Sequence, residues 1–152
     1  MHLAAEPTPL PAESILALDV GDVRIGLAHW TALQGVREAG VLRRTALARD
    51  LARLAHLAAE RRVTRLLLGL PRNLDGSEGP QARRTRRFAQ ALEQALGLPV
   101  VWQDEYGSSQ QATRELGLEG RPLGVRERGQ VDARAAALLL ERYLAQGITG
   151  RE

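Results

Sequence analysis

The sequence has no cysteine and no lysine, few aromatic residues and no long apolar run. The lack of cysteine excludes disulfides, thiolate metal ligands and cysteine nucleophiles. The histidines are scattered along the chain, so a histidine-rich zinc site is not expected. No apolar stretch is long enough to cross a bilayer, and the chain does not begin with a charged segment that leads into an apolar one. We therefore expect a cytoplasmic protein with no membrane partner.

All 21 basic residues are arginine, and the net charge is +3. Arginine forks match the geometry of phosphate groups, but a codon bias toward arginine is the better explanation of the absence of lysine. The charge therefore permits nucleic-acid binding without requiring it. Aromatic residues make up only 3% of the chain, which favours recognition of shape and phosphate over base stacking.

The remaining composition is that of a globular chain, with 44% apolar and 26% charged residues. Residues 1–13 contain three prolines and no periodicity, and we expect them to form a flexible leader. Residues 14–147 are expected to form a single domain, and residues 148–152 a tail.

Short apolar runs alternate with longer segments of helical periodicity, which indicates one α/β domain with a mixed sheet. We expect strands at 15–20, 24–30, 34–42, 64–69 and 99–102, and helices at 45–62, 80–96, 108–116 and 130–146. Thr45 is the expected N-cap of the first helix, and Ser108 or Ser109 that of the third. Pro80 suits the first position of the second helix, and Gly97 suits its end. Residues 117–129, rich in glycine and arginine, are expected to be a mobile loop.

Three acidic residues occur where a solvated charge is not expected. Asp19 follows four apolar residues of a buried strand, and Glu105 comes just after another strand. Asp132 begins an alanine- and leucine-rich helix and shares its apolar face. The ends of parallel strands meet at one edge of a sheet, so these carboxylates can converge. Mg²⁺ or Mn²⁺ would relieve their repulsion, and two such ions about 4 Å apart can hydrolyse a phosphodiester.

Each of these acids also has a simpler explanation. Asp132 suits the first turn of a helix, where the helix dipole favours an acid. Asp19 could cap a turn, and Glu105 could be a surface charge. Asp104 is a rival to Glu105, because neighbours on a strand face opposite ways. The residues alone therefore leave a metal site as a hypothesis.

Four segments resemble the YqgF/RuvX family in the same order. They are LALDVGDVRIGLA (16–28), LGLPRNLDGSEGPQ (68–81), GLPVVWQDE (97–105) and VDARAAALLL (131–140). The family consists of small bacterial proteins of ribonuclease H-like fold, described as Holliday-junction-resolvase-like and as nucleases of the 16S ribosomal RNA precursor. The resemblance implies an α/β fold of this kind, with a mixed five-stranded sheet flanked by helices.

The resemblance also implies a catalytic, metal-binding set that falls on Asp19, Glu105 and Asp132. It implies a nuclease that uses Mg²⁺ or Mn²⁺, acts on structured nucleic acid and serves ribosome biogenesis. One segment departs from the family pattern, in which Asp-Glu-Arg is followed by Leu-Thr-Thr. Residues 104–109 read DEYGSS here, so the arginine is lost while Ser108 and Ser109 keep the hydroxyl pair.

Six further residues are candidates for substrate binding: Arg24, Asn73, Ser108, Ser109, Arg126 and Arg128. Arg24 could hold a phosphate or be a surface charge of a hairpin, and Asn73 could bind a ligand or stabilise a turn. Arg126 and Arg128 lie in the expected loop before Asp132, where they could clamp a nucleic-acid backbone.

Two other functions remain open at this point. The same metal chemistry would resolve Holliday junctions in branched DNA, which needs two active sites and therefore a homodimer. A non-catalytic RNA-binding module is the second alternative, although the presence of all three carboxylates argues against an inactive site.

Overall fold

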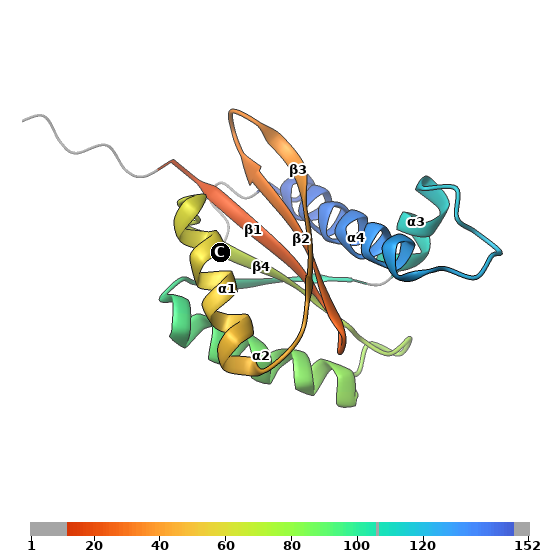
Figure 1. The fold of residues 1–152 in the computed structure, drawn as a ribbon, viewed down its shortest axis with the longest axis horizontal. Coiled ribbons are helices and arrows are strands. Elements are labelled where there is room, and N and C mark those ends of the chain that lie inside the picture. Colours follow the sequence, from red (N-terminus) through yellow and green to blue (C-terminus); the bar gives the residue numbers. More distant parts are fainter. Residues whose placement is uncertain (1–11, 106, 148–152) are drawn as a thin grey trace, which may run out of the picture.

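The computed structural model describes residues 12–105 and 107–147 of the chain (Figure 1). They form one five-stranded mixed sheet with helices on both faces. The strands are β1 (Ser14–Val20), β2 (Arg24–Thr31), β3 (Gly35–Arg43), β4 (Arg65–Leu70) and β5 (Val100–Asp104). The helices are α1 (Leu47–Glu60), α2 (Pro80–Leu96), α3 (Ser108–Glu115) and α4 (Val125–Ala145). Most of the predicted leader, the predicted tail and Tyr106 lie outside the described residues.

The strand order is β3-β2-β1-β4-β5. Strands β1, β2 and β3 are antiparallel neighbours, whereas β4 runs parallel to β1 and β5 parallel to β4. The predicted mixed five-stranded sheet is therefore confirmed. Because β1, β4 and β5 run in the same direction, their carboxyl ends lie at one edge of the sheet.

Side chains of β1 alternate between two apolar layers. Leu16, Leu18 and Val20 pack on the face covered by α1 and α2. Ile15 and Ala17 pack on the opposite face, against alanines of α4. Successive strand residues point to opposite faces, so Asp19 continues the series that faces α4.

Two predicted N-caps are wrong, while Pro80 and Gly97 lie at the ends of α2 as predicted. Helix α1 is capped by Ala46, because the backbone N–H and the hydroxyl of Thr45 both donate to the buried carboxylate of Asp50. The hydroxyl of Thr45 is thus a donor here and does not cap the helix. Helix α3 begins at Ser108 and is capped by Gly107.

Helix α4 begins at Val125, earlier than predicted, so the last part of the expected loop is helical. The carboxylate of Glu127 accepts a hydrogen bond of 2.7 Å from the backbone N–H of Gly124 and fixes this helix start. Asp132 consequently lies about two turns inside the helix. The explanation of Asp132 as a first-turn acid favoured by the helix dipole therefore does not apply.

In the part of the chain that the structure describes, no helix combines the length and apolar character needed to span a bilayer.

Candidate active site

Asp19 is flanked by a glycine on each neighbouring strand. It pairs with Gly26 of β2 across the antiparallel ladder. On the other side, Leu18 pairs with Leu68, so Gly69 lies one step along from Leu68 beside Asp19. Because neither neighbour carries a side chain, Asp132 and Glu105 can approach Asp19 on the face that α4 covers.

At Gly26 the backbone of α4 lies directly against the sheet. A Cβ atom on Gly26 would overlap the backbone oxygen of Asp132, so no residue with a side chain fits at this position. Glycine inside a strand marks such an approach of another backbone. The small size of Gly26 therefore brings the Asp132 segment of α4 down beside Asp19.

Gly69, which also lacks a side chain, leaves room for Glu105 in the same way. A Cβ atom on Gly69 would lie 2.7 Å from Oε1 of Glu105 and 2.8 Å from Cδ1 of Leu139. Oε1 of Glu105 is buried, and among the described residues it has no hydrogen-bond partner. An acceptor in that position is costly unless a proton or a cation accompanies it.

The alternation of β5 distinguishes Glu105 from Asp104. Val101 packs in the apolar layer beneath α4, whereas Trp102 packs in the layer beneath α1 and α2. Glu105 is an even number of positions from Val101, so it faces the same side of the sheet, and it lies against Gly69, beside Asp19. Asp104 is exposed and borders a separate hollow of about 420 Å³ together with Asn73.

The pKa values of two of the acids are strongly raised. Burial, and then the charge of Asp132, raise the pKa of Asp19 to about 7. Burial, followed by the charges of Asp19 and Asp104, raises the pKa of Glu105 to about 8. Both carboxyl groups are thus substantially protonated near neutral pH, and a nearby cation would favour their ionised forms.

Asp132 differs because it has a basic partner. Nε of Arg24, at the start of β2, lies 2.7 Å from Oδ2 of Asp132, and both side chains are about one-fifth exposed. Across residues 12–105 and 107–147, no group of three or more histidine, cysteine or acidic side chains is arranged to hold a metal ion. Asp132 contacts Gly26 on one side of Asp19 and Glu105 contacts Gly69 on the other, but the Asp132 carboxylate is held by Arg24.

The other predicted site residues lie in different surroundings. The amide of Asn73 donates to the hydroxyl of Ser77 within the loop after β4, which is a turn contact. Ser108 is buried, and its hydroxyl accepts a hydrogen bond of 2.9 Å from Arg142. Ser109 is on the first turn of α3, where its carbonyl accepts a hydrogen bond from Thr113.

Arg126 and Arg128 are exposed on the first turns of α4 and not in a loop. Arg128 precedes Asp132 by one turn and shares its side of the helix, whereas Arg126 does not. Sequence reasoning missed the roles of Gly26 and Gly69. Both glycines interrupt apolar strands at positions that face the same side of the sheet as Asp19, and this pattern could have indicated their roles from the sequence.

A mixed sheet in this strand order, with Asp19 near the carboxyl end of β1, defines the class of ribonuclease H-like folds. A solved structure described as Thermus thermophilus RuvC in complex with Holliday junction substrate matches with a TM-score of 0.53 and 19% identity. The match covers 89% of this chain and 96% of that chain, and it is a likeness of fold. The predicted ribonuclease H-like fold is confirmed.

The family follows from sequence. The family model described as RuvX, Holliday junction resolvase, matches residues 13–146, and the chain belongs to this family. A relative from Anaeromyxobacter dehalogenans (strain 2CP-1 / ATCC BAA-258) is 50% identical over 132 residues, which are 85% of this chain and 94% of the relative. One from Synechococcus elongatus is 41% identical and covers 89% of this chain and 91% of its own length. Both are named as candidate pre-16S rRNA nucleases.

Proposed function

We propose that this protein is a metal-dependent nuclease that hydrolyses phosphodiester bonds in structured nucleic acid. One observation carries the proposal: Asp19 lies between two glycines and close to two other acids. The charge of Asp132 raises the pKa of Asp19, and the charge of Asp19 raises the pKa of Glu105. Burial of acids without enough basic partners destabilises a fold. Such an arrangement is typical of a functional site.

Asp19, Glu105 and Asp132 are the residues that would hold Mg²⁺ or Mn²⁺. Their oxygen donors suit these hard cations, and the buried Oε1 of Glu105, which accepts no hydrogen bond from the described residues, fits a cation ligand. The bound metal would supply an activated water and stabilise the leaving oxygen. For Asp132 to contribute, its carboxylate must exchange the guanidinium of Arg24 for the metal.

Two arginines are placed to bind the substrate. Arg24, once released from Asp132, would face the same edge as the scissile phosphate, and its fork matches phosphate oxygens. Arg128, one turn before Asp132, would contact the backbone on the α4 side. The other four candidates are weaker. Asn73 has a turn contact, Ser108 a packing contact and Ser109 a contact within its helix. Arg126 faces away from Asp132.

We propose the 16S ribosomal RNA precursor as the substrate, which places the protein in ribosome biogenesis in the cytoplasm. The names of the relatives support this assignment. The description of the RuvX family favours a second candidate, resolution of Holliday junctions. That reaction needs two cuts and therefore a homodimer. A non-catalytic RNA-binding module would have no need of acids with raised pKa values.

A cleavage assay tests the proposal. A precursor RNA fragment and a four-way DNA junction are incubated with Mn²⁺ or Mg²⁺ and with wild type, Asp19→Asn or Asp22→Asn. Asp22 is a matched control, because its side chain is 62% exposed and pairs with Arg84 at the surface. We expect wild type and Asp22→Asn to cut the RNA, and Asp19→Asn to be slower by about a hundredfold or more.

The results separate the hypotheses. Equal cleavage by Asp19→Asn would overturn the assigned site. Cleavage of the junction alone, by a dimeric protein, would favour the resolvase. If wild type bound the RNA and cut neither substrate with either metal, the protein would be a binding module.

A further inference from the structure

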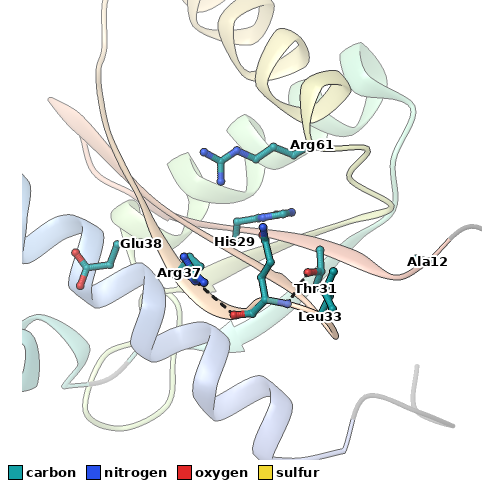
Figure 2. A pocket seen from close by; sticks show the side chains of 8 residues that line it. Ala12, His29, Thr31, Leu33, Arg37, Glu38 and Arg61 are labelled. Atoms are coloured by element: carbon teal, nitrogen blue, oxygen red, sulfur yellow. Dashed lines mark hydrogen bonds between the residues drawn. The ribbon is translucent and has the colours of Figure 1, made fainter.

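A second hollow lies at the opposite end of the sheet from Asp19, and we call it the hairpin-end pocket. Its volume is about 730 Å³, and its lining includes His29, Thr31, Gln34, Arg37, Glu38 and Arg61 (Figure 2). Thr31 pairs with Ser14 at the start of β1, whereas the candidate active site is at Asp19. Ser14 and Asp19 are five positions apart on β1, or roughly 17 Å.

The two sites also use opposite faces of the sheet. His29 pairs with Leu16, which packs toward α1 and α2. Asp19 has the other parity and faces α4. A single phosphate cannot contact both sites, so the hairpin-end pocket is separate from the catalytic edge.

The hydrogen bonds of His29 define which of its ring nitrogens carries a proton. His29 is only 5% exposed, and its Nε2 lies 2.7 Å from the hydroxyl oxygen of Ser14. That hydroxyl donates its one proton to the carbonyl oxygen of Arg61. Nε2 of His29 is therefore the donor to Ser14, and Nδ1 is a bare acceptor on the neutral ring. No described residue bonds Nδ1.

The ring of His29 remains neutral because of its surroundings. Burial, and then the charge of Arg61, lower the pKa of His29. Arg61 follows the last residue of α1, and the bond from Ser14 fixes its backbone. The pocket thus places a neutral acceptor beside a cation.

A second arginine completes the lining. Arg37 pairs with His29 across β2 and β3, so the two side chains are neighbours on one face. Nε of Arg37 donates to the carbonyl oxygen of Gln34 at 3.4 Å. Within residues 12–105 and 107–147, no carboxylate forms an ion pair with Arg37 or Arg61.

The acidic residue of the lining does not neutralise these arginines. Glu38 pairs with Arg134 of α4 at 2.9 Å. Figure 2 shows its side chain on the α4 side, apart from His29 and Arg61. The pocket therefore carries two cations that have no acidic partner among the described residues.

We propose that the hairpin-end pocket binds a ribonucleotide, with its phosphate on Arg61 and Arg37 and a ribose hydroxyl donating to Nδ1 of His29. Guanidinium groups are the preferred partners of phosphate in proteins. The bare Nδ1 requires a donor, which a phosphate dianion lacks and a ribose supplies. The volume lies within the range of small-molecule sites. A free nucleotide and a nucleotide within an RNA strand present the same groups.

Nuclear magnetic resonance titration without divalent cations tests this site. The probes are adenosine 5′-monophosphate, its 2′,3′-dideoxy analogue, inorganic phosphate and a short RNA with a 5′-phosphate. We expect the ribonucleotide to shift the signals of Ser14, His29, Arg37 and Arg61 and to leave those of Asp19 and Gly26 unchanged. The ring nitrogens of His29 report the tautomer directly. The dideoxy analogue and inorganic phosphate should bind more weakly.

Variants of the two arginines provide the second measurement. Arg61→Gln and Arg37→Gln should each weaken binding about tenfold, as expected for loss of a charged hydrogen bond. Arg49→Gln is the matched control, because Arg49 is exposed on α1, the helix that Arg61 follows, and lies outside the lining of the pocket. Thermal unfolding confirms that the variants fold.

Binding of the free nucleotide would identify the pocket as a regulatory site. Binding of the RNA alone would identify it as a second contact for the RNA strand. Both results support nucleotide binding in the hairpin-end pocket. The proposal is overturned if neither adenosine 5′-monophosphate nor the RNA shifts the pocket signals. It is also overturned if a variant that combines Arg61→Gln with Arg37→Gln binds as wild type does. Because no metal or cleavage is involved, failure of the nuclease proposal would leave this result unaffected, and the reverse also holds.

Discussion

Arg24 and Asp132 form an ion pair of 2.7 Å at the point where β2 meets α4. The pair joins a strand residue to a helix residue 108 positions later in the chain. It gives one of the three proposed metal ligands a basic partner, whereas burial without such a partner raises the pKa values of Asp19 and Glu105. If Asp132 is a metal ligand as proposed, the guanidinium and the metal ion would compete for the same carboxylate.

Replacement of Arg24 should increase metal affinity. We expect Arg24→Gln to bind Mn²⁺ about fivefold more tightly in calorimetry, because a partly exposed ion pair contributes about 1 kcal/mol or less. Its cleavage of RNA should nevertheless fall, since a phosphate contact is lost. Arg24→Lys keeps the charge and should remain close to wild type in metal affinity. Weaker Mn²⁺ binding by Arg24→Gln would show instead that Arg24 orients Asp132 for the metal.

Neighbouring substitutions after β5 should separate the two rival ligands. Glu105→Gln should weaken Mn²⁺ binding by about tenfold or more and slow cleavage, because it removes the buried carboxylate beside Asp19. Asp104→Asn serves as the control, and its effect should remain below about threefold. Electron paramagnetic resonance of Mn²⁺ measures both affinities. The reverse order would assign the ligand to Asp104.

The stability of the metal-free protein should fall as the pH rises. The folded pKa values of Asp19 and Glu105, about 7 and about 8, exceed the ordinary values of 3.8 and 4.5. The folded state thus holds more protons than the unfolded state, and its stability decreases from about pH 4 to about pH 8. Urea unfolding at several pH values measures this slope.

Asp19→Asn isolates the contribution of one carboxyl group. The variant should be more stable than wild type by about 2 kcal/mol near pH 8, and by little near pH 4. Saturating Mn²⁺ should stabilise wild type and have much less effect on the variant. If the two proteins showed the same pH slope, burial of Asp19 would not be costly.

Addition of one methyl group at Gly26 should disturb the whole fold. Gly26→Ala would place Cβ against the backbone of Asp132, and we expect a loss of about 3 kcal/mol in the free energy of unfolding. Gly129→Ala is the matched control, because its Cβ would meet only a side-chain methyl of Val41 at 3.1 Å. Alanine also favours a helix by about 1 kcal/mol over glycine. Equal stability of the two variants would disprove the close contact at Gly26.

The strands and the second helix could be predicted because their signals are local. Apolar runs define β1 and β4, and Pro80 and Gly97 mark the ends of α2. The start of α4 could not be predicted in this way, since 125–129 have the glycine and arginine content of a loop. Two contacts define it instead: Glu127 accepts a hydrogen bond from the backbone N–H of Gly124, and Gly129 is buried against Val41 of β3.

The candidate site was predictable to a different degree at each residue. Asp19 stands out because a charge interrupts a buried strand. The residues alone leave Asp104 and Glu105 as rivals, and only the family resemblance favours Glu105. The ion pair of Arg24 with Asp132 depends on how α4 crosses the sheet, and no local pattern contains that information. The family resemblance predicts Ser108 as a substrate contact, but its hydroxyl accepts a hydrogen bond from Arg142 of α4.

The contact of α4 with Gly26 has a consequence for how long the site persists. Asp19 is on a central strand and Asp132 on a helix whose backbone touches that sheet, so no loop movement can separate these two acids. Hydrogen exchange at the amide of Asp132 should therefore require opening of the entire helix layer. The backbones that carry the two carboxylates should therefore separate only when the hydrophobic core unfolds, and cleavage or disorder of the loops should leave them in place.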